Sequence, residues 1–553
     1  MTGDPAQRRR TATMGRNAGI VFTAGHEEAQ SLAEALRSAQ LEGVEDIVPA
    51  ADSVGILVDP ERSQLASVLT FAAGLTFEDR PRTGRVVEVE VCFDGADLGA
   101  VADFVALDVA GVVSHLAAAT LRVGWLGFMP GFAYLVGLPD SLASVPRMAR
   151  PRARVPAGSF ALAGGYAGIY PRASPGGWNV LGRTAVRLFD ADRPEPASLV
   201  PGDVVRLRPV ASLVSPEPGL PEPGPPEPGP PERRAISAAG PRRISVLDAG
   251  TLTLIEDLGR VGMAHLGVGR SGPADPLRHR IANLAVGNPA TSAVLEITAS
   301  GPTLRFDCDA HVALVGTCSL RIDGQEAPPA SVHLVEAGQT VSVGTVRQGL
   351  RSYLAVSGGI ETPLVLASRA TDARFSLWPG PLRRGDELDL GTAGRPRGRF
   401  FEPAFGTVLG VEEGPDGCRE PAAAAAFQIL LDHRWEVTPD SDRVGTRLRP
   451  TEPAGARVAA DAARRLPPIA SRATVTGAVQ LPPDGCPIIL GPEHGTVGGY
   501  PIVAVLTPSS ESRGGQLRPG EVVSFDAASS APSTVAAQAA QAVAGWMPTN
   551  LGG

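Results

Sequence analysis

Twenty residues in the second half of the chain bring carboxylates, arginines, a histidine and a serine close together. The stretch reads EDLGRVGMAHLGVGRSGPAD and starts at Glu256. Carboxylates are ligands for hard cations, guanidinium groups hold phosphates or carboxylates, and a histidine transfers protons near neutral pH. We therefore predict catalytic roles for Asp257, His265, Arg270 and Asp275, and binding roles for Arg260 and Ser271. Salt-bridged turn residues are the alternative interpretation for each of them.

The first half contains a comparable stretch, VPAGSFALAGGYAGIYPRASPGGWNVLGRT, from Val155 to Thr184. Glycines and prolines recur between short apolar runs, so the backbone can bend closely around a bound anion. Its polar side chains and those just before it include Arg152, Arg154, Ser159, Tyr170, Arg172, Ser174 and Arg183, of which we select Arg154, Ser159, Tyr170 and Ser174 as binding residues. Tight corners of a β-barrel explain the glycines equally well, and a wall position is favoured for Tyr170.

Five further positions complete the predicted site. They are Glu296, Thr371, Asp372, Tyr500 and His115. His115 lies beside Val112 and Leu116 in a helical pattern, so a core or interface position is favoured over proton transfer. The pair Asp442 and Arg443 is expected to form an internal ion pair. The cysteines do not have the spacing of a metal site, and metal ligands stay unassigned.

The chain contains no lysine, so all 50 basic residues are arginine. This excludes a Walker A phosphate loop, a Schiff base with pyridoxal phosphate, and a biotin covalently bound to this chain. Anions must therefore be held by arginine forks, backbone N–H groups or a metal ion. A high-GC coding bias explains the absence of lysine, and the chemical exclusion holds whatever its cause.

Composition narrows the partners and the compartment. A net charge of −8, spread along the chain, argues against nucleic acid as a partner. No apolar run reaches the ~18–20 residues of a membrane span, and the start MTGDPAQRRRTATMG lacks the apolar segment of a secretory signal. The five cysteines are scattered, as in a reduced protein. We predict a cytoplasmic protein that binds a small-molecule substrate and neither nucleic acid nor membrane.

The elements that position these residues are predicted from periodicity. Apolar residues at helical spacing follow the strand DSVGILVD, with Ser63 as the expected helix cap, and RVVEVEVCFD alternates as a half-buried strand. The repeats SPEPGLPEPGPPEPGPPERR form neither helix nor sheet, so we expect an extended linker between two formerly separate proteins. Beyond the linker, short strands and turns alternate, which is typical of barrels or sandwiches.

The predicted fold class is mainly β with a small α/β unit at the N-terminus. Several domains are expected for 553 residues. The predicted divisions are a disordered tail (1–16), a small α/β domain (17–83), a β-barrel domain (84–210), the linker (211–243), two β domains (244–400 and 401–530) and a second tail (531–553).

Long motifs in both halves resemble a known family. In the first half, LGFMPGFAYLVGLP, PRARVPAGSFALAGGYAGIYP and SPGGWNVLGRT resemble the 5-oxoprolinase B subunit, also called allophanate hydrolase subunit 1 or a sporulation-kinase inhibitor. In the second half, VLDAGTLTLIEDLGRVGMAHLGVGRSGPAD, LEITASGPTLRF, GAVQLPPDGCPIIL and GGYPIVAVL resemble the 5-oxoprolinase C subunit, also called allophanate hydrolase subunit 2 or a biotin-dependent carboxyltransferase domain. The resemblance implies cyclophilin-like β-barrels in both halves of a fused B–C protein.

The resemblance also implies ATP-dependent opening of 5-oxo-L-proline to L-glutamate. The implied partner is a separate 5-oxoprolinase A subunit, and the implied cofactors are ATP and Mg²⁺. A lactam carbonyl is a poor electrophile, and phosphorylation of its oxygen provides a leaving group before water attacks. We assign activation to the B–C pair and ring hydrolysis to the A subunit. Whether the chain forms a homodimer is left open.

The sequence departs from the family pattern at several positions that bear on activity. Tyr166 and Ala167 replace a Gln-Thr pair, and Gly269 replaces a proline. The glycine-rich segment after Asp372 is shortened, and Ile502 stands in place of a lysine. Isoleucine cannot supply that charge, so altered specificity and reduced catalysis both stay open.

Two other functions compete with the 5-oxoprolinase interpretation. One is a carboxyltransferase for urea or a similar amide, which needs a biotin carrier on another chain. The other is a non-catalytic module that inhibits a histidine kinase through the first half. A covalent linker fixes the stoichiometry of the halves, which favours a shared active site over an inhibitor and its antagonist.

Overall fold

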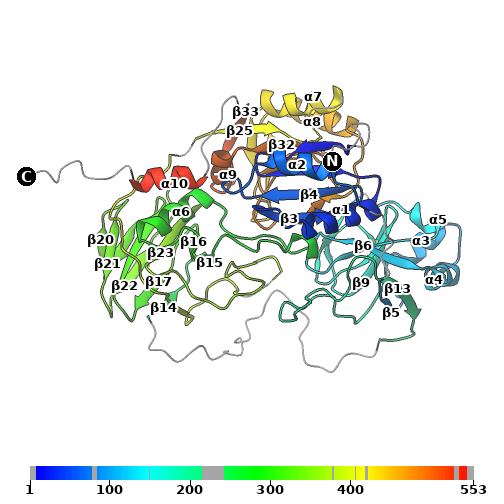
Figure 1. Ribbon diagram of the computed structural model, residues 1–553, viewed down its shortest axis with the longest axis horizontal. Helices are drawn as coiled ribbons and strands as arrows, with labels where there is room; N and C mark the ends of the chain where they lie inside the picture. Colours follow the sequence, from blue (N-terminus) through cyan, green and yellow to red (C-terminus); the bar gives the residue numbers. More distant parts are fainter. Residues whose placement is uncertain are drawn as a thin grey trace, which may run out of the picture.

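The computed structural model describes residues 8–77, 84–148, 150–213, 242–375, 379–404, 406–416, 421–528 and 535–544. Within these ranges the chain is mainly β and forms four units, which run in Figure 1 from blue through cyan and green to yellow and orange. We call them the N-terminal unit, the first barrel, the sandwich and the second barrel. The predicted fold class, with a small α/β unit and a barrel in each half, is confirmed. Most of the predicted linker (211–243) lies outside the described residues.

The N-terminal unit is a four-stranded sheet with two helices. In sheet order its strands are β1 (Thr11–Thr13), β2 (Ala18–Phe22), β4 (Ser53–Val58) and β3 (Val44–Pro49), and its helices are α1 (His26–Ser38) and α2 (Leu65–Gly74). Leu32 of α1 and Val68 of α2 are buried together against the sheet, as the helical spacing of apolar residues requires. Ser63 is not the helix cap, because Gln64 occupies that position and its side chain makes no capping hydrogen bond.

Residues 8–16, which the sequence assigned to a disordered tail, belong to the N-terminal unit. β1 pairs antiparallel with β2, and Arg9 forms an ion pair with Glu28 at 2.7 Å. Met14 is buried in a cluster that includes Val505 of the second barrel. The prediction missed this strand because it is short and polar and gains its stability from residues far away in the sequence.

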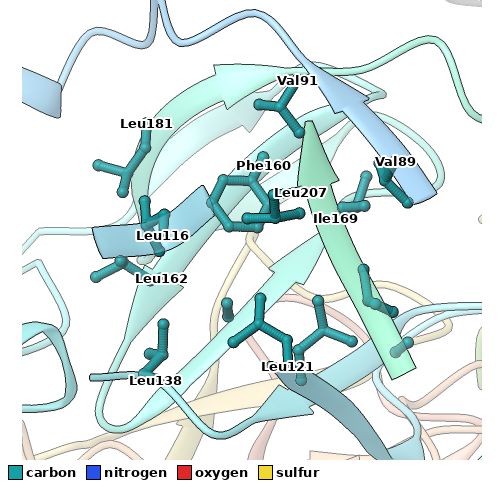
Figure 2. Packing of buried hydrophobic residues seen from close by; sticks show 14 of the residues in the cluster. Val89, Val91, Leu116, Leu121, Leu138, Phe160, Leu162, Ile169, Leu181 and Leu207 are labelled. Carbon is teal, nitrogen blue, oxygen red and sulfur yellow. The ribbon is translucent and has the colours of Figure 1, made fainter. Parts of the chain in front are cut away.

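The first barrel is a seven-stranded sheet that nearly closes on itself. In sheet order its strands are β12 (Asn179–Arg183), β9 (Ser159–Ala163), β10 (Tyr166–Ile169), β7 (Ala133–Val136), β6 (Leu121–Leu126), β13 (Val204–Pro209) and β5 (Val86–Val91). Its helices are α3 (Leu98–Phe104), α4 (Val109–Ala118) and α5 (Asp140–Ala143). The N–H groups of Cys92 and Arg183 donate to each other's carbonyls at 2.9 Å and tie the two edges together. Figure 2 shows Val89, Phe160 and Leu116 filling the interior.

The second barrel is closed. Around the barrel its strands are β25 (Val408–Glu413), β32 (Ile502–Leu506), β29 (Ala478–Gln480), β30 (Ile488–Leu490), β27 (Gly445–Pro450), β26 (Trp435–Val437) and β33 (Val522–Ala527). The helices of this unit are α7 (Pro421–Asp432), α8 (Pro453–Arg465) and α9 (Pro508–Gly514). Leu409, Leu448 and Val503 lie in its core.

The two barrels have the same strand order. In each, the first strand along the chain pairs parallel with the last (β5 with β13, β25 with β33), and the other strands follow in the same order. Each barrel also carries a two-stranded ribbon: β8 (Arg152–Val155) with β11 (Ser174–Gly176), and β28 (Arg472–Ala473) with β31 (Val497–Gly498). The chain therefore contains the same arrangement of strands twice.

Each barrel is braced by an arginine–aspartate pair at the equivalent place. Arg152 donates to the two carboxylate oxygens of Asp97 at 2.8 and 2.6 Å, and Asp97 also accepts an N–H from β12 at 2.7 Å. In the second barrel Arg472 donates to Asp416 at 2.6 Å, and Asp416 accepts the N–H of Ile502 at 3.1 Å. The brace thus ties the ribbon to the main sheet in both barrels.

The sandwich consists of two sheets packed face to face. One sheet contains β20 (Gln325–Ala327), β19 (Leu320–Ile322), β22 (Thr340–Val343), β17 (Thr303–Phe306), β14 (Arg243–Asp248) and β24 (Glu387–Asp389). The other contains β15 (Leu252–Glu256), β16 (Val294–Thr298), β23 (Arg351–Val356), β18 (Ala310–Val315) and β21 (Val332–Val335). Phe306 and Leu295 meet in the core between them. α6 (Pro276–Ala285) packs with α10 (Val535–Ala544) on one side of the sandwich.

The N-terminal unit contacts both barrels (Figure 1). Gln30 of α1 donates to the carbonyl of Gly124 in the first barrel at 2.8 Å. On the other side, Gly55 of β4 lies so close to Ala473 that an added Cβ would be 2.2 Å from that side chain. The small unit therefore holds together two barrels that come from different halves of the chain.

Within the described ranges, the structure contains no single helix that is both long and apolar enough to cross a membrane. The pair α3 and α4, bent by 89° at its break, passes the same test of length and composition when the two helices are taken together.

We expect Asp97→Ala to destabilise the first barrel by about 1–3 kcal/mol, because Arg152 and a backbone N–H both lose their acceptor. Thermal unfolding measures the change. The control is Asp94→Ala, which removes an exposed pair with Arg183 and should cost about 0–1 kcal/mol. Equal losses in the two variants would contradict a bracing role for Asp97.

Candidate functional site

Residues 257–275, which we call the strap, leave the sandwich and contact the other three units. A strap N–H donates to Asp46 of the N-terminal unit at 3.1 Å, and the Leu266 carbonyl accepts the N–H of Gly131 in the first barrel at 2.9 Å. Another strap N–H donates to the carbonyl of Pro492 in the second barrel at 3.1 Å. Within the described ranges, the strap therefore forms hydrogen bonds with each of the other three units.

The strap passes the first barrel at a glycine. Gly267 has a φ of 77°, and a Cβ at this position would lie 2.3 Å from the carbonyl oxygen of Met129. Both the backbone conformation and the close approach require a residue without a side chain. Gly267 thus allows the strap to pack against the first barrel.

Arginines and carboxylates from three units meet beside the strap, and we call this cluster the junction. Its members are Arg172 of the first barrel, Arg260 of the strap, Asp372 and Arg374 of the sandwich, and Glu493 of the second barrel. Asp372 and Arg260 are each 1% exposed. The carboxylate of Asp372 accepts a backbone N–H at 2.7 Å, which fixes its orientation.

Burial controls the charges of the junction. Burial and the neighbouring Glu493 raise the pKa of Asp372 to about 6, and Arg260 and Arg374 oppose this shift. Burial lowers the pKa of Arg172, Arg260 and Arg374, and the charge of Asp372 opposes the shift in all three. Guanidinium groups stay protonated. Glu256 and Asp257 also act on Arg260, and Asp442 also acts on Arg374, so carboxylates surround the cations of the junction.

Arg443 of the second barrel is buried among three carboxylates. It lies 2.7 Å from Glu493 and 3.1 Å from Glu256, and it donates directly to Glu296. Burial alone raises the pKa of Glu296, but Arg443 and Arg351 outweigh it and hold that pKa below its ordinary value. Burial raises the pKa of Glu256 well above its ordinary value despite Arg443. The positive charge of Arg443 thus stabilises the ionised form of Glu296 more effectively than that of Glu256.

The internal ion pair predicted between Asp442 and Arg443 is wrong. Asp442 accepts the N–H groups of Val444 at 2.8 Å and Gly445 at 3.1 Å, as a turn residue does. The guanidinium of Arg443 points instead toward the buried carboxylates of the sandwich.

An aromatic cluster of the first barrel borders the junction. Its members are Trp125, Phe128, Phe132, Tyr134, Tyr166, Tyr170 and Trp178. Trp125 and Tyr134 are stacked with ring centres 4.8 Å apart, and Tyr166 meets Trp125 edge-on at 5.2 Å. The guanidinium carbon of Arg374 lies 5.7 Å from the centre of the Phe128 ring. Tyr166, one of the departures from the family pattern, therefore extends this apolar wall.

A cleft of about 240 Å³ opens between the N-terminal unit and the strap. α1, β3 and the loop between them contribute Leu36, Arg37, Gln40, Leu41, Val44, Glu45, Asp46 and Ile47, and the strap contributes Gly262 and His265. Burial raises the pKa of Asp46 to about 6, and hydrogen bonds from two strap N–H groups oppose this shift. The cleft is thus built from both halves of the chain.

The imidazole of His265 is neutral at pH 7. Burial, and secondarily the charge of Arg37, lower its pKa to about 4. Nδ1 lies 3.0 Å from the carbonyl oxygen of Gly262, so Nδ1 carries the proton and donates it to that carbonyl. Nε2 is therefore an acceptor.

Two of the four predicted catalytic residues lie at the cleft, and the other two make structural bonds within the second half. His265 lines the cleft, and Arg270 forms an ion pair with Glu45 of the cleft at 2.6 Å. Asp275 caps α6 and pairs with a guanidinium of the same helix at 2.6 Å. Asp257 accepts the hydroxyl of Ser368 at 2.6 Å. Catalysis by any of the four stays a prediction.

The predicted binding residues of the second half are buried but have different partners. Arg260 and Asp372 belong to the junction. Ser271 has a φ of 57° and is 5% exposed, and its hydroxyl has no hydrogen-bond partner among the described residues. The hydroxyl of Thr371 accepts a backbone N–H of β15 at 3.2 Å, which is a structural bond. Glu296 pairs with Arg443.

Among the predicted binding residues of the first half, Tyr170 donates its N–H to the carbonyl of Ser159 at 3.0 Å, and Arg154 and Ser174 lie on the paired strands β8 and β11. Tyr170 is buried in the aromatic cluster, Ser159 and Ser174 are buried in β9 and β11, and Arg154 is exposed on β8. Tyr500 is 40% exposed beside the ribbon of the second barrel. The wall position favoured for Tyr170 agrees with its burial.

His115 is exposed on α4, so the core position favoured for it is wrong, whereas the interface position stays a prediction. Val112 and Leu116 of the same helix are buried, and the helical period turns the intervening position outward. α4 packs on α3 and β13, away from the junction and the cleft.

Sequence reasoning did not select Arg374, Glu493 or Asp46. A signal existed for Glu493, because it follows a proline after a short strand just as Arg172 does. Asp46 lies in a strand of alternating residues and carries no mark of a site. Among the residues that the structure describes, no three His, Cys, Asp or Glu side chains are grouped to hold a metal ion.

Family models for the carboxyltransferase domain match both halves. The model described as subdomain A and B matches residues 266–527, and the model described as subdomain C and D matches residues 12–199. The chain belongs to the carboxyltransferase-domain family.

Its two halves are similar to two separate proteins. The second half is 31% identical over 289 residues to the C subunit of 5-oxoprolinase from Escherichia coli, covering 51% of this chain and 90% of that protein. The first half is 45% identical over 128 residues to the B subunit of 5-oxoprolinase from Escherichia coli, covering 23% of this chain and 58% of that protein. The chain is thus consistent with a fused B–C protein, as the motifs predicted.

Longer relatives exist as well. Urea amidolyase of Saccharomyces cerevisiae is 29% identical over 304 residues, which covers 52% of this chain and 16% of that protein. A solved structure of the protein TTHA0988 matches 94% of this chain and 100% of that chain, with 34% identity and a TM-score of 0.79. The four-unit arrangement is therefore shared with a protein of similar extent.

We expect Gly267→Ala to destabilise the chain by about 1–3 kcal/mol from backbone strain alone, with a further loss from the contact with Met129. The control is Gly324→Ala, whose φ of 80° is similar but whose Cβ would meet nothing within 4 Å. Thermal unfolding of both variants separates the two effects. A strap that is not docked on the first barrel would give equal losses.

The raised pKa of Asp372 predicts a pH dependence. The folded chain holds a proton that the unfolded chain releases between pH ~4 and ~6, so this group lowers stability as pH rises through that window. We expect Asp372→Asn, relative to the native chain, to gain about 2–3 kcal/mol of stability between pH 4 and pH 7.5. Unfolding at the two pH values measures the gain, and an unchanged difference would contradict the shift.

Proposed function

We propose that this chain is the B–C component of an ATP-dependent 5-oxoprolinase. It activates 5-oxo-L-proline, and a separate protein like the 5-oxoprolinase A subunit completes the opening to L-glutamate in the cytoplasm. Similarity to both the B and the C component within one chain supports this proposal. The match spans 58% of the B-component relative, so the activity of the whole enzyme is carried over as a proposal.

The observation that carries the proposal is the junction, because neither half contains it alone. Arg172 comes from the half that is similar to the B component, and Arg260, Asp372, Arg374 and Glu493 come from the half that is similar to the C component. Two separate proteins that build one site must remain together, and a covalent linker secures this at fixed stoichiometry.

The side chains of the junction suit the anions of this reaction. 5-Oxoproline carries a carboxylate, and both ATP and the activated lactam carry phosphate, which arginine forks bind through paired hydrogen bonds. Donors fixed in a site of low dielectric stabilise developing negative charge more strongly than water does. Asp372 is mostly ionised at pH 7, because its pKa is about 6, and orients the guanidinium groups around it.

In this proposal the nucleotide is held through its phosphates by arginine. The chain has no lysine for a phosphate loop, and Mg²⁺ commonly binds through substrate phosphates with few protein ligands. ATP supplies the phosphoryl group that turns the lactam oxygen into a leaving group. Arg172, Arg260 and Arg374 bind and orient that group in this proposal.

A carboxyltransferase function is the second candidate, favoured by the relation to urea amidolyase and by the description of the matched family. Biotin would arrive on another chain, since this one has no lysine to carry it. The junction would then hold a carboxylated biotin or the carboxylate product.

The test is a reconstituted reaction. The purified chain, a 5-oxoprolinase A-component protein, ATP, Mg²⁺ and 5-oxo-L-proline should yield ADP and L-glutamate. We expect Arg172→Gln to lower the rate about 10–100-fold, because one charge-assisted hydrogen bond to an anion is lost. Arg206→Gln on the exposed side of β13 makes the same chemical change away from the junction and should leave the rate unchanged.

Absence of 5-oxoproline-dependent ADP and glutamate would sink the 5-oxoprolinase proposal. Transfer of carboxylate from a biotin carrier to an amide under the same conditions would support the second candidate instead. Equal rates for Arg172→Gln and the native chain would show that the junction takes no part in the reaction.

A further inference from the structure

The backbone of the first barrel makes a strained turn directly after β6. The N–H of Met129 donates to the carbonyl of Gly127 at 2.7 Å, which closes a γ-turn around Phe128. Phe128 has a φ of 64°, and among the described residues it is the only aromatic one with a positive φ. A γ-turn of this hand is rare and strained. Such strain persists only where the surrounding structure imposes it, and it is concentrated at functional sites.

Two other units hold this turn in place. Against the second barrel, a Cβ added to Gly127 would lie 2.4 Å from the side chain of Val497. Against the strap, a Cβ added to Gly267 would lie 2.3 Å from the carbonyl oxygen of Met129. Backbones that approach this closely leave the turn no room to relax. The docked units therefore impose the conformation of Phe128.

The turn directs the ring of Phe128 toward Arg374 of the junction. The guanidinium carbon of Arg374 lies 5.7 Å from the centre of this ring and 4.7 Å from the centre of the Phe375 ring. Phe132 and Tyr170 meet the ring of Phe128 edge-on, with centres 5.4 and 6.2 Å away. Two aromatic rings thus contact one guanidinium, and the first half of the chain supplies one of them.

Arg374 depends on these rings for its orientation, because its polar contacts are few. Within the described residues it makes one hydrogen bond, to the carbonyl of Glu493 at 3.4 Å, and it forms no ion pair there. Arg443, by contrast, pairs with three carboxylates. Attraction to the negative face of an aromatic ring holds a guanidinium without using its N–H donors. The donors of Arg374 therefore stay available.

We propose that Phe128 is a positioning residue for the junction, whose ring holds the guanidinium of Arg374 in the orientation that the reaction uses. The inference rests on the proposed function for the part that Arg374 plays. It also accounts for the strained turn, since a relaxed backbone at this position would point the ring in another direction. Because the strap and the second barrel impose the turn, Arg374 is oriented only when the two halves are docked.

The test is a double-mutant cycle in the reconstituted reaction. Phe128→Leu keeps an apolar side chain and the strained backbone but removes the ring, so we expect kcat/KM to fall about 3–10-fold. Arg374→Gln alone should lower kcat/KM about 10–100-fold through loss of a charged donor. Phe128→Leu should have little further effect in the Arg374→Gln chain, because the ring acts through that guanidinium.

Two controls separate positioning from folding. Phe128→Tyr retains the ring and should keep most of the native rate. Phe93→Leu makes the same change at a half-buried phenylalanine that meets Phe160 at 6.0 Å within the first barrel, and it should leave the rate unchanged. Thermal unfolding of each variant shows that it is folded.

Three results would overturn the inference while glutamate formation by the native chain keeps the 5-oxoprolinase proposal standing. The first is an equal loss from Phe128→Leu in the native and the Arg374→Gln chains, as a purely structural role would give. The second is a Phe128→Tyr chain as slow as Phe128→Leu. The third is an unchanged rate in Arg374→Gln.

Absence of any 5-oxoproline-dependent turnover overturns the 5-oxoprolinase proposal, and thermal unfolding of the same four chains then decides the inference. A loss in Tm that is smaller in the double variant than the sum of the two single losses supports the hold of Phe128 on Arg374. Additive losses overturn it.

Discussion

The arrangement of the second half depends on one buried guanidinium. Arg443 extends from the second barrel to Glu256 and Glu296 of the sandwich, and it also pairs with Glu493 of its own barrel. Removing one partner from such a buried cluster leaves an uncompensated charge, which costs about 3–5 kcal/mol. These ion pairs therefore hold the sandwich and the second barrel together independently of the strap.

The strap turns this rigid pair into a platform for the first half. Its backbone bonds to Asp46, Gly131 and Pro492 need three separate units in place at once. The N-terminal unit contributes from the other direction, since it packs on both barrels through Gln30 and Gly55. The junction and the cleft lie along the same strap, which explains how both can combine residues from distant parts of the sequence.

Much of the fold was predictable because local patterns agree with it. The alternation in β5 and the helical spacing in α2 gave the right element types, and the lysine-free composition excluded whole classes of chemistry. β1 and the helix cap near Ser63 were missed because distant packing and not local sequence decides them. The site was only partly predictable for the same reason. Spacing placed Asp257, His265 and Asp275 in one cluster, but the extended strap carries them to different surroundings, and nothing local marks Asp46 as a neighbour of His265.

The two barrels contribute side chains of opposite charge to the junction. Arg172 follows Pro171 after β10, and Glu493 follows Pro492 after β30, so equivalent positions of two like scaffolds carry opposite charges. The charge of Asp372 raises the pKa of Arg172, and Glu493 raises the pKa of Asp372. Two copies of the second barrel around this aspartate would concentrate negative charge, whereas the unlike pair balances it. The charge at this corner therefore distinguishes two barrels that otherwise share their strand order.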